Sequence, residues 1–340
     1  MSALEQALAQ AVPPLSKIHI IKKLGEGSFG TVYESEIEGQ KRAIKIIPLN
    51  KSREDVQREY DTLERLRHTN IVRLHGMGWI EGYIPAMYLV MELGMLTLGK
   101  LVITQRDSDF FLRDGRLESC LFDLSKAISY LEDEGILHQD IKPENVLVWI
   151  SDAGTHHYKL TDFGLATIVN CRGYLAASSK FGGTPFFMSP EALRGDTKHI
   201  DHRSEVYSLG VVGFWLAMSN LPYDDIESDD PRAARAKILT ELKKQAGEQL
   251  KLTPGDFNPE LRDIVGIINQ MLCFEKNGRQ TPAELKQQLQ RILNVSWAWQ
   301  CSSVFIAKQA HQIDSFLADS PLVWLRSSGW PRASAEPGAT

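Results

Sequence analysis

Apolar and polar residues alternate in short runs over the first part of the chain. These runs are rich in β-branched and aromatic residues and are bounded by glycine or polar residues, a pattern that predicts β-strands. The predicted strands cover residues 18–24, 31–37, 41–47, 71–76 and 87–93. Between the third and fourth runs, residues 53–67 place Val56, Tyr60 and Leu63 on one helical face, with Ser52 as a candidate N-cap.

After Gly94 the pattern becomes mainly helical. A buried helix is expected from Glu205 to Met218, and its apolar run is shorter than the about 20 residues that span a bilayer. Thr281-Pro-Ala-Glu284 reads as a capping box, and Ser189-Pro190-Glu191 places a cap before a proline in the same way. A small β-rich lobe therefore precedes a larger helical lobe, which predicts a bilobal α+β fold.

The expected domain organisation has three parts. Residues 1–16 end in Pro13-Pro14 and are interpreted as a leader, and residues 17–294 as one domain. Its N-lobe is expected to cover 17–93 and its C-lobe 94–294.

The remaining residues, 295–340, form a tryptophan-rich C-terminal extension, which holds Trp297, Trp299, Trp324 and Trp330. An apolar stripe at helical spacing predicts a helix over 302–319, which either packs on the large lobe or stands apart to bind a regulatory partner. The final residues, rich in Ser, Gly, Pro and Ala, are expected to be disordered.

Charge and composition narrow the functional classes. The formal net charge of -5 provides no basic footprint for nucleic acid or an anionic membrane, so neither is an expected partner. Residues 1–12 lack the basic and apolar regions of a signal peptide, and we expect a cytoplasmic location, with a nuclear one not excluded. The four cysteines are widely scattered without metal-ligand spacing, which indicates isolated thiols.

A glycine-rich loop is the first candidate for chemistry. Residues 25–30 read Gly-Glu-Gly-Ser-Phe-Gly, so the glycines are Gly25, Gly27 and Gly30. In a dinucleotide-binding fold a helix would follow the third glycine, whereas here the β-rich run 31–35 follows. The loop therefore joins two antiparallel strands. Glycines allow the backbone to approach phosphate oxygens closely, so such a hairpin can cover a nucleotide.

Further motifs follow in a fixed order. They are Ala43-Ile44-Lys45, the run from His138 to Asn145 (HQDIKPEN), Asp162-Phe163-Gly164, Gly183-Thr184-Pro185 and Ser189-Pro190-Glu191. This order resembles the signature set of eukaryotic-type protein kinases of the serine/threonine class, over roughly residues 18–294. The resemblance implies ATP and Mg²⁺ as cofactors and proteins as substrates.

The resemblance also implies a role for each polar residue of these motifs. Lys45 would contact the α- and β-phosphates and pair with Glu59, for which Asp55 and Glu54 are the competing candidates. Asp140 would be the catalytic base, and Lys142 would offset charge on the γ-phosphate. Asn145 and Asp162 would hold Mg²⁺, which prefers hard oxygen ligands.

An adenine pocket is implied in the same way. Met91 would be the gatekeeper residue, and backbone groups of Glu92 and Gly94 would bond the adenine edge. The apolar residues that would enclose the nucleotide are Leu24, Val32, Ala43 and Leu147. Leu63, Leu74, His138 and Phe163 match the internal stack that aligns the lobes.

Three residues depart from the family pattern. Gln139 replaces the arginine before the catalytic aspartate, so we expect activity without a phosphate on the activation loop, where Ser178 and Ser179 are the candidate sites. Ser189 replaces an alanine, and Glu191 is still expected to pair with Arg279. Glu205 replaces the aspartate that anchors the catalytic loop; it is expected to keep the charge while adding a methylene.

Alternative functions remain at this point. Lys142 and the Gly-Thr-Pro run favour serine/threonine over tyrosine as acceptor. A pseudokinase scaffold that acts through the C-terminal extension is the main alternative, and the intact set of Lys45, Asp140, Asn145 and Asp162 argues against it. A small-molecule kinase is disfavoured by the full segment 162–191. The acidic run 224–230 either binds basic substrate residues or is a solvated loop.

Overall fold

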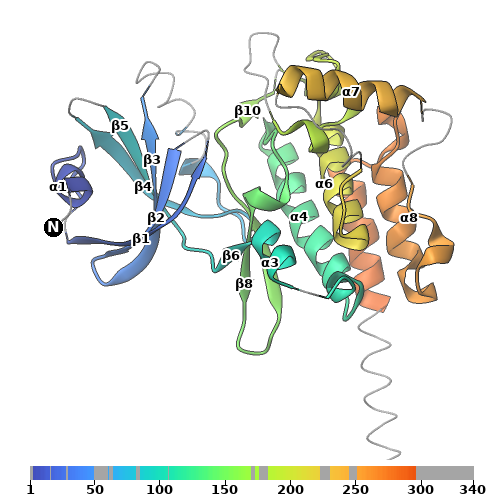
Figure 1. Ribbon diagram of the computed structural model, residues 1–340, viewed down its shortest axis with the longest axis horizontal. Coiled ribbons are helices and arrows are strands. Elements are labelled where there is room, and N and C mark those ends of the chain that lie inside the picture. The colour runs from blue at the N-terminus through green and yellow to red at the C-terminus, as the bar shows by residue number, and fades with distance from the viewer. Residues whose placement is uncertain are drawn as a thin grey trace, which may run out of the picture. The chain divides into compact units, whose positions relative to one another are not determined.

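A computed structural model of the chain describes most residues up to 295 (Figure 1). The described residues are 3–15, 17–27, 30–49, 60, 64–81, 85–105, 107–169, 173–175, 183–222, 230–244 and 251–295. Residues 1–292 form one compact unit and 293–340 a second. The candidate pairing residue Glu59, most of the predicted helix 53–67, Ser178, Ser179 and the predicted helix 302–319 all lie outside the described residues.

The small lobe is a five-stranded antiparallel sheet with the strand order β1-β2-β3-β5-β4. Its strands are β1 (Ile18–Gly27), β2 (Gly30–Ile37), β3 (Gln40–Pro48), β4 (Leu74–Ile80) and β5 (Ala86–Met91). All five predicted strands are therefore found, although β4 begins three residues later than predicted. The delay follows from the chain path: Ile71 forms a bridge with Leu160 of the large lobe before the strand begins.

Alternating side chains give this sheet two apolar faces, as the period of two in a strand requires. Met87 and Leu89 of β5 face one side with Tyr60, whereas Tyr88 and Val90 face the other side. Apolar side chains thus pack on both sides of the sheet. Ala43 and Lys45 lie within β3.

The second face is covered by the N-terminal segment. Helix α1 (Ala3–Ala9) packs there, and its Leu8 is fully buried. Glu5 Oε1 accepts a hydrogen bond of 2.8 Å from Ile20 N in β1, and Val12 pairs through its backbone with Trp79 in β4. Residues 3–15, which the sequence suggested as a leader, are therefore packed as part of the small lobe.

The large lobe is built mainly from helices. They are α3 (Leu98–Thr104), α4 (Arg116–Asp133), α5 (Pro190–Leu193), α6 (His202–Met218), α7 (Pro231–Lys244) and α8 (Arg262–Met271), followed by helical residues 282–295. Its short strands are β6 (Leu96–Thr97), β7 (Ile136–Leu137), β8 (Val146–Ile150), β9 (His156–Leu160) and β10 (Thr167–Ile168). A large apolar cluster, centred on α4, α6 and α8, fills much of this lobe, and a smaller cluster lies around α5 and α7. The predicted α+β fold, with a β-rich small lobe and a helical large lobe, is confirmed.

Local signals set the helix starts in this lobe. The Thr281–Glu284 capping box forms as predicted, since Glu284 N donates to Thr281 Oγ1 and Thr281 N donates to Glu284 Oε2. Ser189 Oγ accepts from Ala192 N at the start of α5. Helix α6 begins three residues before the predicted Glu205, because Asp201 caps it. None of the described helices is long and apolar enough to cross a bilayer.

Candidate active site

The glycine-rich loop joins β1 to β2, as the sequence predicts. Gly27 and Gly30 are register partners at the tip of the hairpin. Gly30 has a φ of 125°, and a Cβ there would lie 2.1 Å from Ile46 O, so no larger residue fits. At Gly25 an added Cβ would meet no other atom within 4 Å, so the backbone of this strand faces open space that a phosphate chain can enter.

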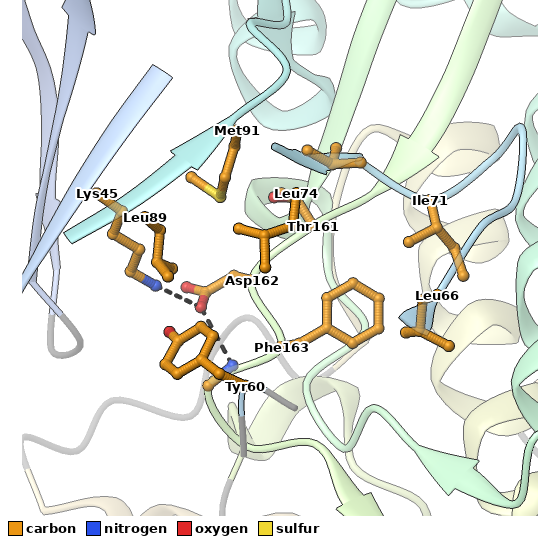
Figure 2. A pocket seen from close by; sticks show the side chains of 12 residues that line it. Lys45, Tyr60, Leu66, Ile71, Leu74, Leu89, Met91, Thr161, Asp162 and Phe163 are labelled. Atoms are coloured by element: carbon orange, nitrogen blue, oxygen red, sulfur yellow. Dashed lines mark hydrogen bonds and ion pairs between the residues drawn. The ribbon is translucent and has the colours of Figure 1, made fainter. Parts of the chain in front are cut away.

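Lys45 lies on β3 opposite Leu89 of β5 and opposite Val32 of β2. Its side chain is buried, and its ammonium Nζ lies 2.6 Å from Asp162 Oδ1, which belongs to a loop of the large lobe (Figure 2). Asp162 has a φ of 61°, and Asp162 Oδ1 also accepts a weak bond from Gly164 N at 3.4 Å. Lys45 and Asp162 lie 117 positions apart in the sequence, and the fold brings them into direct contact.

Behind this ion pair lies a small cavity of about 40 Å³. Figure 2 shows Tyr60, Leu89 and Met91 on one side of it and Phe163 on the other. The ring of Phe163 packs edge-on against His138, with centroids 4.7 Å apart. Leu74 of the small lobe and Phe163 of the large lobe both line this cavity, as expected for members of the internal stack. Leu63 lies outside the described residues.

The apolar residues predicted to enclose adenine come from both lobes. Ala43 is the register partner of Met91, and Val32 lies on the neighbouring strand. Gly94 packs on Leu147, since a Cβ at Gly94 would lie 2.9 Å from the Cβ of that leucine.

Between these surfaces the segment that joins the lobes supplies backbone polar groups. Glu92 N donates to Arg73 O at 2.9 Å, so the Glu92 carbonyl is the group of this residue left for a ligand. The carbonyl of Leu24 accepts a long bond of 3.5 Å from Lys100 Nζ of α3. These are the surfaces between which the sequence predicts that adenine binds.

Asp140 is the centre of a hydrogen-bond network in the large lobe. Its Oδ1 accepts from both Thr184 N and Thr184 Oγ1 at 3.0 Å, and Lys142 Nζ lies 2.8 Å from its Oδ2. Lys142 Nζ also donates to Thr184 Oγ1 at 2.7 Å. Burial alone would raise the pKa of Asp140, but the hydrogen bond and charge of Lys142, aided by Thr184, lower it below its usual value. Asp140 is therefore an ionised carboxylate.

Asn145 is oriented by the same network. Its Nδ2 donates to Asp140 O at 2.8 Å and to Asp140 Oδ2 at 2.9 Å, so its amide oxygen Oδ1 is turned away from these bonds. Together, Asn145 Oδ1 and the Asp162 carboxylate offer hard oxygen ligands. The described residues contain no cluster of three or more His, Cys, Asp or Glu side chains that could hold a metal. Two ligands fit Mg²⁺, which usually keeps several waters and takes phosphate oxygens as its remaining ligands.

Two site residues were not identified as such from the sequence. Thr184 contacts both Asp140 and Lys142, and its only sequence signal is its place in the Gly-Thr-Pro run. Gln139 has a φ of 68°, and its Nε2 donates to Leu165 O at 2.7 Å and to Thr167 Oγ1 at 2.9 Å. Strand β10, which contains Thr167, pairs with β7 directly before the catalytic loop. Gln139 thus binds the start of the segment that follows Asp162.

Glu205 anchors the catalytic loop, as expected, but its burial works against the negative charge that the sequence suggested it would keep. Glu205 Oε1 accepts from the backbone N–H of His138 and, at 3.0 Å, from that of Gln139. Burial raises the pKa of Glu205 to about 8, and the two backbone bonds offset this only in part. Burial therefore favours the neutral acid over the carboxylate.

The predicted pair of Glu191 and Arg279 is confirmed. The guanidinium donates through Nη1 at 2.7 Å and Nη2 at 3.0 Å to the two carboxylate oxygens. Burial would raise the pKa of Glu191, but the bidentate Arg279 lowers it below its usual value. This pair ties α5 to the segment before residue 281.

Comparison with known proteins shows which sequences this chain resembles. The sequence pattern of the protein kinase domain matches residues 18–290. The chain is 29% identical over 80% of its length to the serine/threonine-protein kinase dst2 of Dictyostelium discoideum. It is 33% identical over 61% of its length to the probable serine/threonine-protein kinase zyg-1 of Caenorhabditis briggsae, and 31% identical over 62% to serine/threonine-protein kinase 36 of Pongo abelii. These matches span 22%, 28% and 15% of the three relatives.

Proposed function

This chain belongs to the protein kinase family, and we propose that it is an active serine/threonine kinase that transfers the γ-phosphoryl group of ATP to protein substrates. One observation carries the proposal: the ionised Asp140 is bonded to Asn145, Lys142 and Thr184 in a single network. A protein kinase domain uses ATP and Mg²⁺ in general, and each polar group that such a reaction requires has a candidate among the described residues.

The nucleotide is proposed to bind between the two lobes. Val32, Ala43 and Leu147 would contact the adenine ring, with Met91 behind it and the backbone of Glu92 and Gly94 at its edge. The glycine-rich hairpin would cover the phosphates with its backbone, since its glycines leave room for close approach. Because phosphate groups are anionic, Lys45 is proposed to bind them when nucleotide is present.

Asn145 and Asp162 are the residues proposed to hold Mg²⁺. The ion would supply positive charge to the phosphates, which lowers the energy of a transition state with dispersed negative charge. The chain's own contribution is the rigid orientation of the two ligands. Asn145 is fixed by its bonds to Asp140, and Asp162 is held by Lys45.

Asp140 is proposed to orient the acceptor hydroxyl and to take its proton during transfer. A base must be ionised at the working pH, and Lys142 keeps Asp140 in that form. Thr184 occupies Oδ1, so Asp140 is fixed in place for the acceptor. Thr184, which contacts both Asp140 and Lys142, lies in the Gly-Thr-Pro run. This run resembles the serine/threonine class and therefore supports serine or threonine as acceptor.

The Gln139 contacts support activity without a phosphate on the activation loop. In kinases switched by such a phosphate, an arginine at this position binds it, whereas glutamine carries no charge. Here Gln139 instead donates two hydrogen bonds to Leu165 and Thr167. We therefore propose that neutral contacts order the start of this segment.

The proposal is tested by incubating the purified chain with labelled ATP, Mg²⁺ and a library of peptides that contain serine, threonine or tyrosine. We expect phosphoserine and phosphothreonine, and no transfer when Mg²⁺ is chelated. Transfer to tyrosine alone would contradict the acceptor assignment. Bound ATP without transfer to any peptide or to the chain itself would favour the pseudokinase alternative.

A further inference from the structure

Glu205 binds the catalytic loop through one of its two oxygens only. It lies in the first turn of α6 and is 4% exposed. Both backbone N–H groups, of His138 and Gln139, bond to Oε1. Oε2 is buried and has no hydrogen-bond partner among the described residues. We propose that Glu205 positions the catalytic loop as a neutral carboxylic acid, whose Oε2–H is directed into a small cavity beside the loop.

Among the described residues, the charged groups that act on Glu205 provide no positive charge to balance a carboxylate. Glu132 of α4 and Asp201 at the N-cap of α6 both act on it as negative charges. His138 and His202 are kept neutral by burial, which lowers the pKa of each. A buried anionic oxygen without a partner is costly, whereas a neutral acid keeps its carbonyl oxygen as an acceptor for both N–H groups.

A second buried glutamate shows how much the missing cation matters. Glu191 is also 4% exposed and lies nearby, since Ser204 Oγ donates to it at 2.6 Å. Arg279 binds both oxygens of Glu191 and lowers its pKa, although burial acts in the opposite direction. That guanidinium is fully engaged with Glu191 and with backbone carbonyls, so it leaves Glu205 uncompensated. At equal burial, Glu191 is therefore an anion, whereas Glu205 is a neutral acid.

The cavity beside Glu205 can satisfy the proton of a neutral acid. It has a volume of about 30 Å³, and its polar lining includes Glu205, Ser204 and Ser208. This volume is enough for a water molecule, for which about 10–15 Å³ suffices. Ser208 Oγ donates to Ser204 O at 3.3 Å, which leaves its lone pairs to accept from Oε2–H directly or through water.

The charge state has a consequence for stability that can be measured. The pKa of a glutamate in the unfolded chain is near its ordinary value, and in the folded chain it is raised. The contribution of the protonated form to stability is therefore complete below the ordinary glutamate value, declines as pH rises from there to the raised value of about 8, and levels off above it. The inference deepens the proposed kinase function, but this readout does not depend on activity.

The first experiment compares melting temperature against pH, from about pH 6 to about pH 9.5, for the wild type and Glu205→Gln. The amide matches a neutral acid in shape and in its donor and acceptor. We expect the wild type to lose melting temperature relative to Glu205→Gln as pH rises from about 6 to about 8, and the difference to stay constant above about pH 8. Glu118→Gln is the matched control, because Glu118 is another buried glutamate with a raised pKa and should leave the decline in place. Parallel curves for wild type and Glu205→Gln would overturn the proposal.

A second measurement detects the protonated carboxyl group directly in the folded wild type, without a change in stability as its readout. Infrared spectra of the wild type should contain a carboxylic acid C=O band at neutral pH that disappears above about pH 9, and Glu118→Gln should retain this band. A spectrum without a band that titrates in this range would overturn the proposal. So would failure of Glu205→Gln to fold, since a neutral amide should replace a neutral acid.

Turnover then tests the positioning role. Glu205→Leu removes both acceptor bonds to the catalytic loop, so we expect its kcat to fall at least about tenfold below that of Glu205→Gln, with a much smaller change in KM for ATP. Equal kcat values for the two variants would show that the bonds to His138 and Gln139 do not position the loop.

Discussion

The two lobes hold their candidate site residues in different ways. In the small lobe, Lys45, Ala43 and Val32 lie on strands, and their positions follow from the register of an antiparallel sheet. In the large lobe, Asp140 and Asn145 lie in a loop that is fixed by side-chain hydrogen bonds, including two that Glu205, more than sixty residues later in the chain, accepts from its backbone. The site therefore depends on sheet packing on one side and on a polar network on the other.

Asp140→Asn breaks the polar network at its centre and should have the largest effect. The amide cannot take a proton, so we expect the rate of transfer to fall by about 10²–10⁴-fold. ATP affinity should change little, because Asp140 contacts none of the predicted adenine-binding residues. The control is Asp133→Asn, which changes an exposed aspartate at the end of α4. A variant within about threefold of wild type would refute the assignment of Asp140 as base.

Leu8→Ala tests the packing of the small lobe instead. Leu8 is fully buried between α1 and the sheet, so we expect a loss of about 2–5 kcal/mol in the free energy of unfolding. Denaturant unfolding measures this, with Val12→Ala as the matched control, because the Val12 side chain is 55% exposed. Equal stability of the two variants would mean that residues 3–15 do not support the sheet.

Asp162→Asn tests the junction between the two lobes. The amide lacks the charge that binds Lys45 and that we propose for Mg²⁺, so nucleotide binding should require more Mg²⁺. Titration of Mg²⁺ against bound nucleotide in both proteins gives the two midpoints, and we expect them to differ by about tenfold, or 1.4 kcal/mol. Identical midpoints would show that Asp162 is not a ligand.

Loss of phosphate from the activation loop should have the smallest effect. Since Gln139 binds Leu165 and Thr167 without charge, dephosphorylated protein and the double variant Ser178→Ala/Ser179→Ala should stay within about threefold of the untreated wild type. Intact mass confirms the removal of phosphate before the assay. A drop beyond about tenfold in both samples would show that a loop phosphate is needed after all.

The sequence predicted the sheet more completely than the polar network. The strand pattern and the glycine spacing were enough to place Gly30, Lys45 and Met91, because side-chain period and hairpin register are local properties. The pair of Glu191 and Arg279 also followed from the motifs. The hydrogen bonds of the Gln139 side chain could not be predicted from the motifs, because they depend on the positive φ of this residue and on the path of β10 beside β7.

Charge state was the other feature that local pattern could not provide. Glu205 and Glu191 are both glutamates near a helix start, and the sequence gives no reason to assign them different pKa values. The motifs predict the Arg279 partner of Glu191, but only the folded chain shows that Glu205 lies near Glu132 and Asp201. The packing of residues 3–15 likewise required the sheet on which Leu8 is buried.

The most direct test of the account is phosphoryl transfer by the purified chain itself. Wild type and Asp140→Asn are incubated with labelled ATP and Mg²⁺, and ATP binding is measured for both by equilibrium titration. The account predicts phosphate on serine and threonine in the wild type, and near-complete loss of transfer in Asp140→Asn with ATP affinity retained. Equal transfer by both proteins, or ATP binding without transfer by the wild type, would contradict the claim that this network performs catalysis.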